Sequence, residues 1–184
     1  MNGSHLICTI VLAAGTAKRF GSLKQLQNLD GQSLVRRAAK IALASGTAVS
    51  VVTGAESERV GAELADLPLS LIHNAQWQRG MGHSLAYAVN AMEQRHPSIA
   101  AVLILLADQA LIHVQDLQKI LSEHEAHPDA IIAAAQGDDI LGPPCLFPAR
   151  YLDALKALDG DRGARALIQQ HRESVRRVDV PNAS

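Results

Sequence analysis

The chain has 184 residues and a mass of 19.6 kDa, the size of one domain that can bury a full core without disulfides or a structural metal. Apolar residues make up 48% and charged residues 19%, a composition that argues against long disordered segments. The formal net charge of -1 argues against a protein that coats nucleic acid or an anionic membrane by bulk charge. We therefore expect a single domain over residues 1–184 with no nucleic-acid or membrane partner.

Charge and cysteine placement give two further expectations. Residues 1–40 hold six basic side chains and one acid, so positive charge is concentrated near the N-terminus. Cys8 and Cys145 lie in apolar surroundings far apart in sequence, which predicts core thiols. Since no secretory pattern is visible and no apolar run reaches the length of a membrane span, a reducing cytoplasm is the simplest expected compartment.

Strand and helix patterns alternate along the first 135 residues. The nearly continuous apolar run at 6–14 predicts a central strand buried on both faces of a parallel sheet. Ser33 is expected to cap the first helix and Gly46 to end it. This alternation is typical of βαβ units. After that first helix, the patterns predict strands at 48–53, 69–72, 99–106 and 130–135, and helices at 56–65, 84–94 and 114–125.

The alternation stops after residue 135. Residues 142–148, GPPCLFP, predict an ordered loop with an edge strand or an irregular strand, because proline cannot donate to a sheet ladder. Two short helices are expected near 149–158 and 163–171, and a last strand at 175–180. The predicted fold class is a three-layer α/β domain with a mostly parallel sheet and an irregular C-terminal part.

The first strand leads into a small-residue turn, Ala13-Ala14-Gly15, where ligands of open parallel sheets bind. Backbone N–H groups can approach a ligand closely there, and Lys18, Arg19 and Lys24 follow within ten residues. The segment is either a phosphate-binding loop or a basic surface turn.

Three familiar motifs are not matched. A Walker loop needs Lys where this chain has Ser22, and the dinucleotide fingerprint needs Gly where it has Leu85. The nucleophile elbow of serine hydrolases likewise needs Gly at Ala86. A P-loop NTPase, a Rossmann dehydrogenase and a serine hydrolase are therefore disfavoured.

Asp108 follows eight apolar residues of a predicted strand. A carboxylate is costly inside a sheet, so Asp108 should emerge at the strand's carboxyl end, on the same edge as Gly15. Its oxygens suit Mg²⁺, which takes one or two carboxylates together with phosphate oxygens and water. The alternative is an aspartate that caps a helix or a turn.

The segment Gly80-Met81-Gly82 precedes the helix expected from His83 or Ser84. Its backbone donors could meet a base or a phosphate, or the segment is a flexible loop with Ser84 as the N-cap. Trp77 is either a core residue or a lid contact. The pair His124 and His127 is read as a solvated helix end, not a zinc site, because no third strong ligand is visible.

Four segments carry a resemblance to a known family, and together they cover nearly the whole chain: LAAGTAKRFGSLKQL, NAQWQRGMGHSLAYAV, LLADQA and GPPCLFPARYLDALKALDGDRGARALI. They resemble the molybdenum cofactor cytidylyltransferase family within the MobA-like NTP transferases. The first is similar to the signature L-A-A-G-x-x-x-R-x-G-x-x-K, matched by Leu12, Ala13, Ala14, Gly15, Arg19, Gly21 and Lys24. Many nucleotidyltransferases share it, whereas Gly160-Asp161-x-Gly163-Ala164-Arg165 resembles the subfamily that modifies molybdopterin.

The resemblance implies a Rossmann-like nucleotidyltransferase domain and a role for each matched residue. Catalysis falls to Lys24 at the α-phosphate, to Arg19 at the triphosphate and to Asp108 as ligand of Mg²⁺. Asp161 is a weaker candidate, as a second metal ligand, an acceptor-site group or a turn residue paired with Arg165. The residues expected to bind the nucleotide are Leu12, Ala13, Ala14, Gly15, Arg19, Lys24, Gly82 and Ser84.

The implied reaction is transfer of CMP from CTP to the phosphate of the molybdopterin cofactor, with release of pyrophosphate. Guanylyl or other nucleotidyl transfer to a different phosphorylated metabolite stays open, as does a non-catalytic nucleotide- or cofactor-binding protein. Expected partners are CTP, the phosphorylated pterin, and a transient molybdoenzyme or its chaperone. The chain departs from the family pattern at His83, Ala110 and Gly142-Pro143-Pro144, in loops expected to line the acceptor side.

Overall fold

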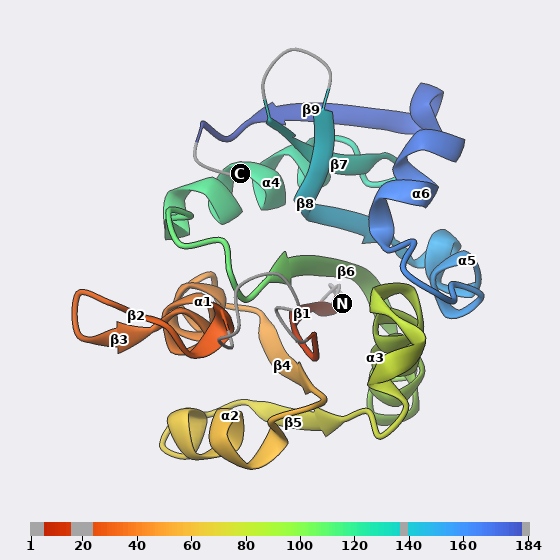
Figure 1. The fold of residues 1–184 in the computed structure, drawn as a ribbon. Coiled ribbons are helices and arrows are strands. Elements are labelled where there is room, and N and C mark those ends of the chain that lie inside the picture. The colour runs from red at the N-terminus through yellow and green to blue at the C-terminus, as the bar shows by residue number, and fades with distance from the viewer. Residues whose placement is uncertain (1–5, 16–23, 137–139, 182–184) are drawn as a thin grey trace.

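The computed structural model describes residues 6–15, 24–136 and 140–181, and it contains a seven-stranded sheet with helices on both faces (Figure 1). The sheet order is β5-β4-β1-β6-β8-β7-β9. A separate two-stranded hairpin is formed by β2 and β3. The strands are β1 (Leu6–Ala13), β2 (Asn28–Leu29), β3 (Gln32–Ser33), β4 (Ala48–Thr53), β5 (Ser70–His73), β6 (Ile99–Leu106), β7 (Ile131–Gln136), β8 (Ile140–Pro148) and β9 (Val175–Asp179).

Six α-helices among the described residues form the two outer layers. Helices α1, α2 and α4 pack on one face of the sheet, and α3, α5 and α6 on the other (Figure 1). None of the described helices has the length and apolar character to cross a membrane. The helices are α1 (Leu34–Ala44), α2 (Ser57–Leu64), α3 (Met81–Arg95), α4 (Val114–Ala126), α5 (Leu152–Lys156) and α6 (Ala164–Gln170), with 3₁₀ turns η1 (Lys24–Leu26), η2 (Trp77–Arg79), η3 (Ala149–Tyr151) and η4 (Arg172–Ser174).

The predicted fold class is confirmed. Strand β1 lies inside the sheet and pairs in parallel with β4 and β6, as its apolar run requires. The β4–β5 and β7–β9 pairs are also parallel, whereas β8 runs antiparallel to β6 and β7. The sheet is therefore mostly parallel and buried under helices on both faces.

Of the alternatives predicted for 142–148, the irregular strand is confirmed and the edge position is wrong. Strand β8 lies inside the sheet, between β6 and β7. Its ladder with β7 shifts register, so that Cys145 pairs with Ala133 while Gly142 pairs with Ala134. Pro143 and Pro144 fall in the unpaired gap, where a missing N–H removes no ladder bond.

Two helix starts also differ from the prediction. Helix α3 begins at Met81 with Gly80 as its N-cap, so Ser84 lies inside the helix. Ser33 does occupy the N-cap position of α1, but its hydroxyl donates to Glu63 at 2.7 Å instead of capping the helix.

The hairpin of β2 and β3 was not predicted. Its turn is Asp30-Gly31, with φ angles of 53° and 82°. A type I′ turn requires positive φ at both central residues, and Asp-Gly is a typical sequence for it. The strands flanking the turn are only two residues long, so they left no alternating pattern to detect.

Both cysteines are free and completely buried, as predicted. Burial raises the pKa of the Cys8 thiol to about 11 and raises that of Cys145 well above its ordinary value. Because the thiolate is the reactive form, neither thiol is expected to react with an aromatic disulfide reagent at pH 8 in the native protein. Absorbance should show two reactive thiols only after denaturation. Fast reaction of the native protein would contradict this burial.

Candidate active site

The carboxyl ends of the parallel strands form one edge that gathers several distant segments. The Ala107 N–H, just after β6, donates to the Leu12 carbonyl of β1 at 3.1 Å. The Asn74 N–H, just after β5, donates to the Thr53 carbonyl at the end of β4 at 2.9 Å. Strand β8 runs antiparallel to β6, so its first residues lie at the same edge. This edge is where an open α/β sheet binds its ligands.

The small-residue turn after β1 is held by a glutamine side chain. The amide of Gln25, in η1, donates to the carbonyl oxygens of Ala13 at 3.4 Å and Gly15 at 2.9 Å. Across from this turn, a Cβ on Gly54 would collide with the Ala14 carbonyl oxygen. The backbone after β1 is thus fixed from both sides, and a Cβ on Gly15 itself would meet open space.

The cations predicted for this loop fall largely outside the described residues. Lys18 and Arg19 belong to residues 16–23, which the structure does not describe. Lys24 follows that segment directly as the first residue of the 3₁₀ turn η1, and its side chain is not described. Their roles at the α-phosphate and triphosphate remain predictions that rest on their place in the sequence.

Asp108 emerges at this edge, two residues after β6 ends, and is half-buried. Its neighbour Gln109 is buried and bridges two strands at this point. The Gln109 side-chain oxygen accepts the Leu106 N–H at 3.1 Å, and its amide donates to the Pro143 carbonyl at 2.7 Å. Gln109 therefore ties the loop that carries Asp108 to the start of β8, next to the cis Pro143–Pro144 bond.

The two glycine-containing motifs, at 80–82 and 160–163, pack against each other. A Cβ on Gly80 would collide with the Gly160 carbonyl, and one on Gly82 with the Arg162 carbonyl. The Gly82 N–H donates to the Gly160 carbonyl at 2.8 Å, so a ligand would not receive that hydrogen bond. Asp161 is exposed, and its Oδ1 would lie 2.7 Å from a Cβ on Gly80.

An asparagine network fixes the first turn of α3. Asn74 is 1% exposed, and its Oδ1 accepts the Gln76 N–H at 3.0 Å. Its Nδ2 therefore donates, to Ser84 Oγ at 3.0 Å and to His83 Nδ1 at 3.2 Å. Because His83 Nδ1 accepts, a neutral His83 carries its hydrogen on Nε2. Ser84, predicted to bind nucleotide, is buried and holds Asn74 in place.

Two arginine side chains, Arg79 and Arg165, make further contacts around the 159–165 segment. Arg79 pairs with Asp159 at 2.8 Å, and this hydrogen bond holds the pKa of the Asp159 carboxyl below its ordinary value. The Arg165 Nε would lie 2.8 Å from a Cβ on Gly142, so this guanidinium lies over the start of β8. The 159–165 segment thus contacts both the start of α3 and the start of β8.

The described residues of the predicted site come together at one edge. Leu12, Ala13, Ala14, Gly15 and Asp108 lie at the ends of β1 and β6, while Gly82, Ser84 and Asp161 lie around the start of α3. Sequence reasoning missed four buried or tightly packed residues that fix these loops: Gln25, Gly54, Asn74 and Gln109. Each stands just after a strand or beside a quoted motif, which is the signal that could have found them. Trp77 packs on Gly54 and on the core, so it is a packing residue.

The arrangement suits one divalent cation carried with a phosphate ligand. Mg²⁺ needs few protein carboxylates when phosphate oxygens and water complete its octahedron, and Asp108 supplies one at the strand end. Among the described residues there is no group of three or more His, Cys, Asp or Glu that could form a cage for a metal. Of the two residues predicted to hold a metal, Asp108 lies just beyond the end of β6 and Asp161 lies beside Gly80 at the start of α3.

A mostly parallel α/β sheet with a small-residue turn and a carboxylate at one edge is compatible with a nucleotidyltransferase domain. The chain belongs to the family of the MobA-like NTP transferase domain, whose model matches residues 9–175. This confirms the broader resemblance seen in the sequence; the specific cofactor cytidylyltransferase within it is not thereby identified.

Relatives and solved structures agree with this assignment. Nicotine blue oxidoreductase of Paenarthrobacter nicotinovorans is 31% identical over 196 residues, covering 100% of this chain and 93% of that protein. Purine catabolism protein PucB of Bacillus subtilis is 29% identical, covering 92% and 83%. The structure of Rv0371c from Mycobacterium tuberculosis superposes with a TM-score of 0.83 at 25% identity, covering 96% and 88%, and Rv0371c has also been solved in complex with manganese.

Proposed function

We propose that this nucleotidyltransferase moves CMP from CTP to the phosphate of the molybdopterin cofactor. The observation that carries the proposal is the contact between the two glycine motifs, since the Gly82 N–H binds the Gly160 carbonyl at the edge that holds Gly15 and Asp108. The 160–165 motif resembles the molybdopterin-modifying subfamily, and its place beside the strand ends fits an acceptor-side wall.

The chemistry is an in-line displacement at phosphorus. An oxygen of the acceptor phosphate forms a bond to the α-phosphorus of the nucleotide, the bond from that phosphorus to the bridging oxygen breaks, and pyrophosphate leaves with the electron pair. Lys24 and Arg19 stabilise the negative charge that spreads over the phosphates. The backbone after β1, fixed by Gln25, offers N–H donors to the same oxygens.

A divalent cation, when bound, neutralises phosphate charge and polarises the α-phosphate. Asp108 would hold it, with Mg²⁺ as the proposed ion. The manganese complex of Rv0371c supports a divalent cation on this fold. The uncharged base requires hydrogen bonds and shape, which Leu12, Ala13 and residues 81–84 would supply.

The test is pyrophosphate release. The purified protein with Mg²⁺ and phosphorylated pterin cofactor should release pyrophosphate with CTP, and more slowly with GTP, ATP or UTP. Faster release with GTP would replace cytidylyl by guanylyl transfer. Release that needs another phosphorylated metabolite instead of the pterin would replace the acceptor, and no release with any nucleotide would favour a nucleotide-binding protein without catalysis.

A second candidate comes from the relative that covers this chain from end to end. That relative, at 31% identity, is named as an oxidoreductase. Redox chemistry would need a hydride or electron donor. The protein would be mixed with a reduced nicotinamide and an organic dye, without CTP. Oxidation of the nicotinamide, measured as the loss of its absorbance, would favour this candidate over nucleotidyl transfer. The proposed transfer predicts no such absorbance change.

Delivery of the product to a molybdoenzyme or its chaperone belongs to the proposal only if the pterin is the acceptor.

A further inference from the structure

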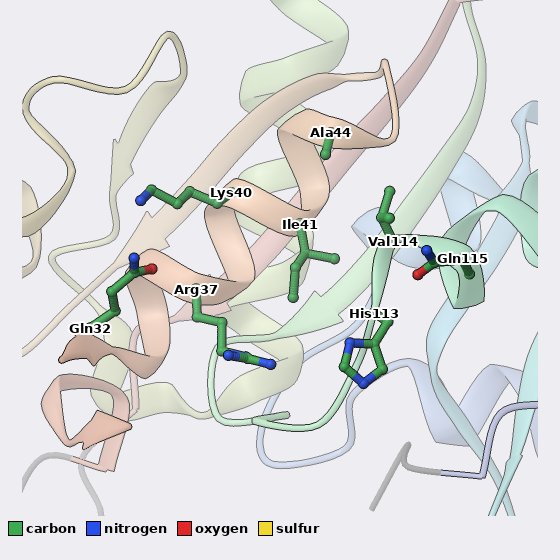
Figure 2. A pocket seen from close by; sticks show the side chains of 8 residues that line it. All are labelled: Gln32, Arg37, Lys40, Ile41, Ala44, His113, Val114 and Gln115. Carbon is green, nitrogen blue, oxygen red and sulfur yellow. The ribbon is translucent and has the colours of Figure 1, made fainter. Parts of the chain in front are cut away.

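A groove of about 340 Å³ lies between α1 and the start of α4 (Figure 2). Its described lining residues are not among the predicted site residues, and His113 stands at the end of the loop that carries Asp108. Its walls combine cationic, amide and apolar side chains, and none of the described residues that line it is acidic. The lining residues are Gln32, Arg37, Lys40, Ile41, Ala44, His113, Val114 and Gln115.

Arg37 distinguishes this groove from an ordinary charged surface. Its Nε is buried and has no hydrogen-bond partner among the residues that the structure describes. The adjacent Arg36 differs, because its guanidinium donates hydrogen bonds to both carboxylate oxygens of Asp66, at 2.6 and 2.7 Å. Because the Nε is closed to solvent, an anion in the groove would meet the outer nitrogens of the Arg37 guanidinium, whose fork matches the oxygens of a carboxylate or a phosphate.

His113 supplies a second donor across the groove. Figure 2 shows the Arg37 guanidinium and the His113 ring turned toward each other, while Lys40 points away from them. The His113 ring accepts the Asp116 N–H in a capping box at the start of α4. On a neutral ring the other nitrogen therefore carries the hydrogen and can donate.

We propose that this groove is a binding site for the phosphate or carboxylate group of a small molecule. Arg37 and His113 would hold the anionic group, and Lys40 would add long-range attraction from the groove wall. The apolar part of the ligand would lie on Ile41 and Val114. The volume lies at the lower end of the range for small-molecule pockets, which favours a metabolite over a folded partner. This inference does not depend on the proposed nucleotidyl transfer.

The experiment follows two local signals by NMR in ¹⁵N-labelled full-length protein. Inorganic phosphate and acetate are titrated separately, and the Arg37 Nε–H and the His113 ring resonances are recorded. A saturable shift of both signals is expected with at least one anion, with a Kd of about 1 mM. The anion that binds more tightly identifies the ligand group as phosphate or carboxylate.

Two Arg37 variants and two control variants make the result specific. Arg37→Met should reduce the size of the anion-induced shift of the His113 ring resonances at least about tenfold. Arg37→Lys should reduce it less, because the positive charge remains. Arg36→Met, on the same helix, should leave it unchanged. An unchanged His113 titration in both Arg37 variants, or no saturable shift in the wild-type protein, would overturn the proposal. Asp108→Asn should not alter these shifts, so failure of the proposed catalysis and failure of this site are separable.

Discussion

Replacing Asp108 by asparagine is expected to lower the rate of pyrophosphate release by roughly 100-fold or more, because the variant loses the carboxylate proposed to hold the cation beside the phosphates. Asp108 is half-buried and lies two residues beyond β6, whose last residue pairs with Leu12 of β1. Asparagine keeps the size of the side chain, so the melting temperature should change little. Kinetics over a range of Mg²⁺ concentrations would measure the loss.

Asp161→Asn is the matched comparison for this variant. Asp161 is exposed on the 160–165 motif. Loss of its carboxylate should reduce the rate of pyrophosphate release by roughly tenfold or less if Asp108 is the principal metal ligand. Lys24→Ala should resemble Asp108→Asn in rate but not in its response to Mg²⁺. If Asp108→Asn retained full activity while Asp161→Asn lost it, the assigned metal ligand would be wrong.

The Gly82→Ala substitution should lower both stability and activity. A Cβ at this position would collide with the Arg162 carbonyl and lie 2.9 Å from that of Asp159, and backbone atoms cannot rotate away as a side chain can. The helix and the 159–163 turn must then separate, at a cost of about 1 to 3 kcal/mol in the free energy of unfolding. Urea unfolding would measure this loss, and the KM for the pterin should rise because the turn moves.

Gly61→Ala is the control, since it makes the same chemical change inside another helix. A Cβ on Gly61 would meet only the Leu71 Cδ1, at 3.4 Å. Alanine favours a helix over glycine by about 1 kcal/mol, so this variant should be as stable as the parent or more stable, with unchanged kinetics. Equal stability of the two variants would show that the motifs do not depend on their close contact.

Apart from the β2–β3 hairpin, the strands and α-helices of the first 135 residues could be predicted because their patterns are local. The strands at 48–53 and 99–106 have the predicted bounds, since each is a buried apolar run between polar turns. The start of α3 could not be predicted from pattern alone. Ser84 is a good N-cap residue in isolation, but packing of Gly80 and Gly82 on the 160–163 turn extends the helix to Met81.

Strand β8 shows a second limit of local patterns. Prolines at 143 and 144 argue against an interior strand, yet the register shift against β7 leaves them unpaired inside the sheet. Only the neighbouring strand determines where such a gap falls. The same limit applies to Gln25, Asn74 and Gln109, because a glutamine or asparagine gives no sign in sequence of which distant carbonyl it will bind.

By itself, the sequence indicated the α/β fold class from its alternating strand and helix patterns, and it indicated the candidate residues Gly15 and Asp108 because open α/β sheets bind ligands at the carboxyl ends of their strands. The tertiary structure decided which loops meet at that edge. It placed the 160–165 motif on the first turn of α3 and left the Nε of Arg37 buried without a described partner. These features depend on contacts between residues far apart in the chain, and no local pattern encodes such contacts.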